Sequence, residues 1–389
     1  MTNQVEPRNR IGKHVCLVGI TILVLAGFCF SQSATSVSSE VSTNWTEFHR
    51  PNMTRLNPFE KVLTVKTVRN LQRKWSYTTG NEVNSSPVVA NGVAYVGSDD
   101  GYLYALNAST GAVIWSFTTG NPGFSSAAVA NGVVYGSSAN NLIALNASTG
   151  AFLWSYITNG SDSSAPTVAN GVVYVGSLDG NLYALNASTG ALLWSYATDA
   201  WDSSPSVVNG VVYVGSGFDN NVYALNASTG AELWSYPTGG QVISSPAVAN
   251  GVVYVGSGDH NVYALKANTG ALLWSYTTGG EVFSSPAMAN GVVYIGSSFD
   301  QNLYALDAST GTLLWKYHTD DSVVSSPAVA NGVVYVGSYD NKVYALNART
   351  GAKLWSYATG SSVYSSPSVV NGMVYIGSDD DKIYAFGLK

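Results

Sequence analysis

The feature that most constrains this chain is a segment of roughly 40 residues that occurs seven times and begins an eighth. The segment reads approximately SSPxVANGVVYVGSxDxxxYALNASTGxxLW. Its closing tryptophans, spaced by 39 to 41 residues, are Trp75, Trp115, Trp154, Trp194, Trp234, Trp274, Trp315 and Trp355. A constant period of this length is typical of solenoids and propellers, in which each repeat buries its apolar surface against its neighbours.

One repeat predicts a meander of four short strands. In the first copy, Val88 to Ala90 is followed by Asn91-Gly92, which favours a tight hairpin because both residues tolerate positive φ. Runs at 93–96, 102–106 and 112–118 are rich in β-branched and aromatic residues and predict three further strands. These runs alternate little between apolar and polar, which indicates a sheet covered on both faces. Blades in a ring are covered in this way, so the pattern favours a propeller over a one-sided sandwich.

The number of repeats predicts how the ring closes. The eighth copy, residues 365–386, stops before its fourth strand, and an unpaired fourth strand at 71–77 precedes the first Ser-Ser-Pro. We therefore predict an all-β fold, an eight-bladed β-propeller of four-stranded antiparallel blades. The N-terminal strand would complete the C-terminal blade and remove the open sheet edges that promote aggregation.

The turn before each closing tryptophan carries a family motif. The pattern A-x-N-x-x-T-G-x-x-x-W runs from Ala105 to Trp115 and recurs in the later full copies, with Lys266 or Asp307 at its third position in two of them. It resembles the tryptophan-docking motif of quinoprotein-type (PQQ-like) propellers over about residues 71–389. The segment from Trp45 to Pro58 is similar to the lead-in of such proteins. The resemblance implies that each docking tryptophan packs against the next blade and has a structural role.

The N-terminus predicts export. Arg8, Arg10 and Lys13 precede an apolar run at 15–30, followed by small and polar residues, which is the pattern of a secretory signal cleaved after Ser33. An uncleaved signal anchor is the alternative, although the run is short for a membrane span. A lipoprotein-like box has one residue too many before its cysteine, so we expect no lipid attachment. We divide the chain into a signal peptide or anchor (1–33), a Ser/Thr-rich linker and lead-in (34–60) and the propeller (61–389).

Several function classes are disfavoured by composition and motifs. The net charge of −6 argues against a nucleic-acid partner, which requires a basic face. Both cysteines, Cys16 and Cys29, fall in the leader, so no disulfide can form within the propeller. The four histidines lack metal-binding spacing, Ser-Ser-Pro recurs as a structural element, and no nucleophile or nucleotide motif occurs. We therefore predict no catalytic, cofactor or metal site.

Strand order assigns the turns to two faces. The Asn-Gly turns and the Asn-Ala-Ser-Thr-Gly turns, which we call docking turns, share what we call the uniform face because they are nearly identical between copies. The Gly-Ser-x-Asp turns and the loops after each tryptophan strand share the variable face. Of the 19 acidic residues after residue 60, all but Glu232 and Asp307 lie in these variable loops. Variable loops on a rigid scaffold commonly bind ligands, and acidic ones attract cations or basic segments.

We predict that acidic and aromatic residues of the variable face bind a protein or another surface ligand of basic or cationic character. The candidates are Glu82, Asp100, Trp201, Asp202, Phe218, Asp219, Asp259, Phe299, Asp300, Asp320, Asp321, Asp340, Asp379 and Asp380. An aspartate that recurs once per repeat has a simpler explanation, because Asp in a short turn bonds its own backbone. That explanation leaves Asp100, Asp202, Asp320, Asp321 and Asp381 as additional acids.

Three functions are compatible with these observations. The leading hypothesis is an exported, non-enzymatic binding or scaffold propeller that resembles BamB-like proteins and acts in the cell envelope or outside the cell. It would meet the membrane only through an uncleaved leader. The alternative is a PQQ-dependent dehydrogenase with calcium, although the short loops and the absence of a propeller cysteine pair disfavour it. A carbohydrate-binding propeller is the third, with Trp201, Phe218 and Phe299 as stacking platforms.

Overall fold

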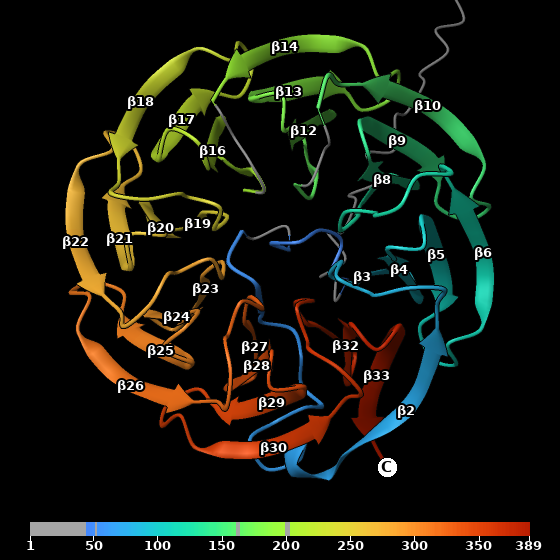
Figure 1. Ribbon diagram of the computed structural model, residues 1–389, viewed down its shortest axis with the longest axis vertical. Coiled ribbons are helices and arrows are strands. Elements are labelled where there is room, and N and C mark those ends of the chain that lie inside the picture. Colours follow the sequence, from blue (N-terminus) through green and yellow to red (C-terminus); the bar gives the residue numbers. More distant parts are fainter. Residues whose placement is uncertain (1–43, 51–52, 161–163, 199–202) are drawn as a thin grey trace, which may run out of the picture. The chain divides into compact units, whose positions relative to one another are not determined.

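The computed structural model describes residues 44–50, 53–160, 164–198 and 203–389. The predicted leader, together with Trp201 and Asp202, lies outside these residues. Eight antiparallel sheets, each with four propeller strands, form a ring (Figure 1), which confirms the predicted eight-bladed propeller. Within the described residues the single helix is the 3-10 turn η1 (Val68–Asn70), and no helix there has the length and apolar character needed to cross a membrane.

Seven blades are continuous in sequence. Blade 1 contains β3 (Val88–Ala90), β4 (Val93–Gly97), β5 (Tyr102–Asn107) and β6 (Val113–Thr118); blade 2 contains β7 (Ala128–Ala130), β8 (Val133–Ser138), β9 (Asn141–Asn146) and β10 (Phe152–Ile157). Blade 3 contains β11 (Thr167–Ala169), β12 (Val172–Gly176), β13 (Asn181–Asn186) and β14 (Leu192–Ala197); blade 4 contains β15 (Ser206–Val208), β16 (Val211–Gly215), β17 (Asn221–Asn226) and β18 (Glu232–Pro237).

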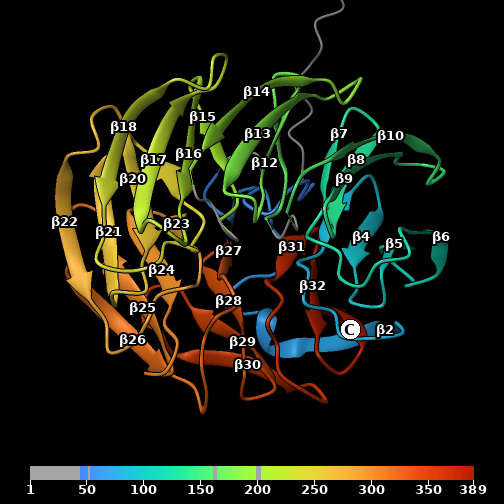
Figure 2. The same ribbon diagram turned by 45° about the horizontal axis from the view of Figure 1, so that its top comes forward.

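The next three blades repeat this order. Blade 5 contains β19 (Ala247–Ala249), β20 (Val252–Gly256), β21 (Asn261–Lys266) and β22 (Leu272–Thr277); blade 6 contains β23 (Ala287–Ala289), β24 (Val292–Gly296), β25 (Asn302–Asp307) and β26 (Leu313–His318). Blade 7 contains β27 (Ala328–Ala330), β28 (Val333–Ser338), β29 (Lys342–Asn347) and β30 (Lys353–Ala358). In every blade the first strand lies nearest the centre of the ring and the fourth lies at its rim (Figure 1 and Figure 2).

The predicted assignment of turns to two faces agrees with the hydrogen bonds of blade 1. The Ala108 amide of the docking turn donates to the Gly92 carbonyl of the Asn-Gly turn at 2.9 Å, which joins the two turns on the uniform face. At the opposite end, the Asp99 amide donates to the Glu82 carbonyl at 2.9 Å and joins two variable loops. The same scaffold therefore presents two chemically different ends.

The tryptophans connect each blade to the next. The indole Nε1 of each of the eight docking tryptophans donates to a main-chain carbonyl of the following blade at 2.9 to 3.1 Å, and for Trp154 the acceptor is Ala187. The hydroxyl of Tyr135 donates to the same carbonyl at 3.0 Å. Gly190 lies under the indole with φ of +72°, and a Cβ there would approach Trp154 Cε3 to 2.6 Å. The glycine of the docking turn is therefore required both by its conformation and by the packed ring.

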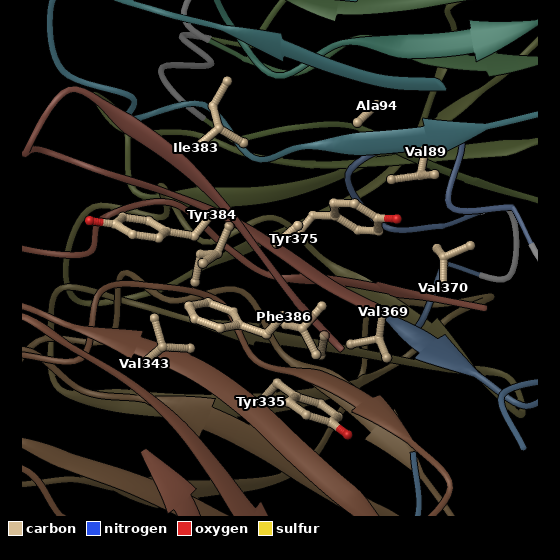
Figure 3. Close-up of a cluster of buried hydrophobic side chains, with 14 of the residues drawn as sticks. Val89, Ala94, Tyr335, Val343, Val369, Val370, Tyr375, Ile383, Tyr384 and Phe386 are labelled. Carbon is tan, nitrogen blue, oxygen red and sulfur yellow. The ribbon is translucent and has the colours of Figure 1, made fainter. Parts of the chain in front are cut away.

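Blade 8 is assembled from both chain ends. It contains β31 (Ser368–Val370), β32 (Met373–Ser378), β33 (Lys382–Leu388) and β2 (Leu71–Thr78), with β2 antiparallel to β33 from Leu71↔Leu388 to Thr78↔Lys382. Buried side chains from blades 7, 8 and 1, including Tyr335, Phe386 and Val89, pack in one cluster across this closure (Figure 3). The predicted closure is thus confirmed, and the apolar contact across it is continuous.

The closure lacks a docking turn, and the neighbouring contacts change accordingly. Trp355 Nε1 donates to the Leu71 carbonyl at 3.0 Å, in place of the alanine carbonyl used at the other seven interfaces. The hydroxyl of Tyr335, fully buried, has no hydrogen-bond partner among the described residues, whereas its counterparts share that alanine carbonyl with the tryptophan. Among the described residues, the interface between blades 7 and 8 is therefore the one at which the tryptophan and the tyrosine do not both donate to a carbonyl of the next blade.

Residues 45–50 and 53–57, predicted to precede the propeller, lie in the centre of the ring, and we call them the central strap (Figure 1). The strap makes a hydrogen bond to the innermost strand of seven blades. These bonds join Trp45 to Val89, Thr46 to Val129, Glu47 to Val168, Met53 to Val248, Thr54 to Met288, Arg55 to Val329 and Asn57 to Val369. Its end, β1 (Leu56–Asn57), pairs in parallel with β27.

The central strap buries charged groups. Arg55, fully buried, donates to the carbonyls of Phe48, Ser326, Pro327 and Pro367. Burial raises the pKa of Glu47 to about 7 and, together with the charge of Arg55, lowers the pKa of His49 to about 3. Glu47 and His49 therefore favour their neutral forms, and Arg55 retains its charge through four carbonyl partners.

Candidate functional site

A cavity of about 590 Å³ lies at the centre of the ring, among the variable loops. Phe48 of the central strap contributes to its lining. The walls come from the residue that precedes Ser-Ser in six blades: Asn84, Phe124, Ile243, Phe283, Val324 and Tyr364. In the sequence this position differs in almost every copy while the serines beside it hardly change, so the position itself is a signal for the cavity.

The serines form a hydrogen-bonded ring around the cavity. In seven blades, the amide of the second residue of the Ser-Ser pair donates to the hydroxyl of the second serine in the next blade. Examples are Ser86 to Ser126 at 2.7 Å and Ser366 back to Ser86 at 3.0 Å. The other steps are Ala165 to Ser204, Ser204 to Ser245, Ser245 to Ser285, Ser285 to Ser326 and Ser326 to Ser366. The ring is interrupted only between blades 2 and 3, where Ala165 replaces the serine. These serines serve as structural donors and acceptors.

Three carboxylates line one side of the cavity, where blades 8 and 1 adjoin. Glu82, Asp99 and Asp379 all line it, and Asn84 Nδ2 donates to Asp99 Oδ2 at 2.7 Å. Burial, followed by the charges of Glu82, Asp99 and Asp380, raises the pKa of Asp379 to about 6. Burial likewise raises the pKa of Asp99. No lysine, arginine or histidine is among the described residues that line the cavity, so nothing there balances the three acids.

A second set of acids has a structural role. Asp259 accepts hydrogen bonds from the Tyr263 hydroxyl at 2.5 Å, from the Gly239 amide of the preceding blade at 2.7 Å and from the Asn261 amide at 3.0 Å. Burial would raise the pKa of Asp259, but these hydrogen bonds outweigh it and lower the pKa. The same tyrosine contact is made by Asp100, Asp179, Asp219, Asp300, Asp340 and Asp380. Six of the predicted binding residues are therefore engaged by the scaffold. Five of them join the turns of adjacent blades, namely Asp100, Asp259, Asp300, Asp340 and Asp380, whereas the described contacts of Asp219 lie within blade 4.

This pattern corrects the assignment in blade 1. Asp100 was expected to be an additional acid, but it makes the recurring tyrosine contact, and Asp99 is the additional one. The spacing of the repeat already separates the two neighbouring aspartates, because Asp100 precedes Tyr104 by four residues, as the recurring aspartates of the other blades precede their tyrosines. The consequence is that Asp99, absent from the predicted set, faces the cavity with Glu82 and Asp379.

The remaining candidates that the structure describes lie away from the cavity lining. Asp320 is 79% exposed in its side chain and forms an ion pair with Lys342 at 2.8 Å, and the Asp321 carboxylate accepts the Ser322 amide. Phe218 and Phe299 are 58% and 74% exposed, in turns of blades 4 and 6. In the register of the repeat, Trp201 occupies the position of the buried residues Val242 and Val282. The proposed carbohydrate platforms are thus not brought together within the described residues.

Comparison with known proteins places the chain in a family. The family model described as outer membrane protein assembly factor BamB matches residues 65–204, 100–241, 197–317 and 300–389. The chain belongs to this family. No curated protein sequence matches the chain.

Solved structures share the fold of this family. BamB from Moraxella catarrhalis is 20% identical with a TM-score of 0.71, covering 82% of this chain and 100% of that one. A europium-containing methanol dehydrogenase is 16% identical with a TM-score of 0.77, covering 89% and 98%. The quinohemoprotein alcohol dehydrogenase ADHIIG from Pseudomonas putida HK5 is 18% identical with a TM-score of 0.76, covering 89% and 80%. At these identities the similarity establishes the propeller fold and leaves the activity to the site.

Proposed function

We propose that this protein is an exported, non-enzymatic propeller that binds a basic segment of a protein partner in the central cavity of its variable face. The observation that carries the proposal is a cavity with aromatic walls and three carboxylates but no described cationic side chain. The family description, an assembly factor, supports a protein partner and a cell-envelope location.

The cavity suits a lysine or arginine side chain on a partner. Its volume falls within the range of about 300 to 1,000 Å³ that is typical of ligand sites. An aliphatic stem would pack on Phe124, Phe283 and Tyr364, and the cationic head would reach Glu82, Asp99 and Asp379. Burial first, and then the charges of Glu82, Asp99 and Asp380, raise the pKa of Asp379, so a bound cation would stabilise its ionised form.

The quinoprotein alternative fits this cavity poorly. PQQ carries three carboxylates, and the described lining offers three further carboxylates and no lysine, arginine or histidine. The sequence adds no lysine or arginine at 161–163 or 199–202. Among the described residues, no three His, Cys, Asp or Glu side chains are grouped to hold a metal such as calcium. The residues present therefore do not match the chemistry of this cofactor.

The test compares two variants with equal charge changes. The cavity variant Glu82→Gln, Asp99→Asn, Asp379→Asn removes the proposed cation partners, and the control Glu281→Gln, Asp320→Asn, Asp321→Asn removes three acids outside the lining. Binding of a panel of lysine- and arginine-containing peptides would be measured by calorimetry. We expect the cavity variant to bind at least about tenfold more weakly, while the control matches wild type. Equal weakening in both would reject the cavity and leave only a diffuse acidic face.

Activity provides an independent test. The protein would be incubated with PQQ and calcium and assayed for dye reduction with alcohols and sugars. We expect no turnover above the rate of the same mixture without protein. Sustained turnover would reject the non-enzymatic function and support the PQQ-dependent dehydrogenase instead.

A further inference from the structure

The uniform face has a local concentration of positive charge at the closure of the ring. The basic seam patch, as we call it, consists of exposed residues on the segment that follows the central strap, on β2, in the blade 7 docking turn and at the C-terminal end. These residues are Lys61, Lys66, Arg69, Lys74, Arg349 and Lys389. Val62 and Val65 hold that segment against Gly372 and Gly332, which belong to the Asn-Gly turns of blades 8 and 7. The patch therefore belongs to the uniform face.

The patch has no balancing acid among the described residues. The acidic side chain that lies closest in sequence, Glu60, is 5% exposed, and its two oxygens accept amides of Val62, Leu63 and Gly372. The ion pairs of the described chain all involve Lys342 or Lys382, which lie on the variable face. Arg69 and Lys389 line one cavity beside Leu71 and Leu388, which shows that cations from the two chain ends converge.

The patch is a departure from the repeat. In blades 1 to 3 the fourth strand begins with an exposed apolar pair, such as Val113-Ile114 or Leu192-Leu193. At the same position blade 8 has Arg73-Lys74 and blade 7 begins with Lys353. The docking turn of blade 7 likewise has Arg349 where most others have serine. Phe59 and Val62, exposed by 37% and 49%, add apolar surface within the same segment. Basic side chains beside exposed apolar ones are the composition of membrane-surface contacts.

The described part of the chain begins on the same face as the patch. Asn44, the first described residue, exchanges hydrogen bonds with Asn91 at 3.2 Å, and Asn91 belongs to the Asn-Gly turn of blade 1. The described chain therefore begins at the uniform face, and the sequence before it includes the apolar run predicted to be a signal peptide or signal anchor.

We propose that the basic seam patch rests on an anionic lipid surface and so directs the acidic cavity away from that membrane. The acidic variable face would be repelled by the same lipids, which makes the orientation selective. This inference goes beyond the proposed peptide-binding function and does not depend on it.

The experiment uses the full chain on vesicles and reads amide hydrogen exchange in residues 58–74. This readout reports contact at the patch whether or not the leader also inserts. Vesicles of phosphatidylcholine alone would be compared with vesicles containing phosphatidylglycerol, at low and high salt. The variant Lys66→Gln, Arg69→Gln would be matched with Lys266→Gln, Lys316→Gln, which removes equal charge outside the patch.

We expect exchange to slow on anionic vesicles, to recover at high salt and to remain fast on neutral vesicles. Each basic residue near an anionic surface contributes roughly fivefold, so the patch variant should lose up to about 25-fold of the protection and the control none. Equal protection on neutral vesicles, or equal loss in both variants, would overturn the proposal. Protection by soluble polyglutamate but not by anionic vesicles would also overturn it and assign the patch to an acidic protein.

Discussion

The uniform and variable faces are made by the same repeat, yet they use it differently. On the uniform face, the docking turns serve the fold: Asn186 accepts the Ser188 and Thr189 amides of its own turn, and Gly190 lies under the Trp154 indole of the preceding blade. On the variable face, the repeat fixes only the recurring aspartates and the serine ring, while the residues between them vary. A scaffold that confines its constraints to fixed positions leaves the intervening positions free to change, and those positions line the cavity.

Among substitutions that compare the two faces, we expect the largest loss of stability at the docking tryptophans. Trp154→Ala should lower the free energy of unfolding by about 3 to 5 kcal/mol, because it removes a buried ring and leaves the Ala187 carbonyl with one donor fewer. Phe299→Ala on the variable face, where the ring is 74% exposed, should change it by less than about 0.5 kcal/mol. Guanidinium denaturation would measure both. Similar losses in the free energy of unfolding would mean that the two faces contribute equally to stability.

The central strap belongs to neither face, because it makes hydrogen bonds to the innermost strands of seven blades around the ring. Its contribution to stability must therefore be measured separately from the comparison of the two faces. Arg55→Met removes donors to the Pro327 and Pro367 carbonyls, and leaving such buried groups unpaired costs about 1 to 3 kcal/mol each. We expect a loss of about 2 to 4 kcal/mol in the same denaturation assay. Lys316→Met, on an outer strand, is the control and should have little effect. A small loss for Arg55→Met would show that the ring closes without the strap.

Glu47 of the strap predicts a pH dependence with a definite sign. Its pKa is raised by burial from 4.5 to about 7, so the folded state favours the protonated form and loses stability as pH rises from about 4.5 to 7. Glu47→Gln should therefore gain on the order of 3 kcal/mol at pH 8 and nothing at pH 4. Stability would be measured at both pH values. His49→Gln serves as the counterpart, because a lowered histidine pKa costs stability only as pH falls below 6.5.

The sequence predicted the ring and its closure because both follow from a repeated pattern. The strands of blade 1, the two faces and the pairing of the N-terminal strand with the C-terminal blade are all present. The course of residues 45–57 could not be predicted, since Trp45 and Arg55 belong to no repeat and their partners lie up to 312 residues away. A non-repeated segment has no copies that reveal which of its residues are buried.

The candidate residues were predicted on the variable loops, some of which line the cavity, but many of them were chosen by charge rather than by position. Glu82 and Asp379 line the cavity, whereas Asp259 and its equivalents are engaged by tyrosine hydroxyls and amides. Charge alone does not separate these cases, whereas spacing does, because the recurring aspartates precede a tyrosine by four residues and Asp99 and Asp379 precede one by five. The residue before Ser-Ser would have been the better guide, since only its side chain varies beside an unchanging serine ring.

The smallest predicted effect separates the recurring acids from the additional ones within the variable face. Asp259→Asn should cost about 1 to 2 kcal/mol, because the amide replaces a charged acceptor for Tyr263 and Gly239. The hydrogen bonds hold the pKa of Asp259 below its usual range, so this cost should be present above about pH 4 and fade at lower pH. Asp320→Asn, at a largely exposed carboxylate, should produce no measurable change. If denaturation at pH 7 gave equal losses, the division between structural and free acids would fail, and with it the reason for assigning the ligand to the cavity rather than to the whole acidic face.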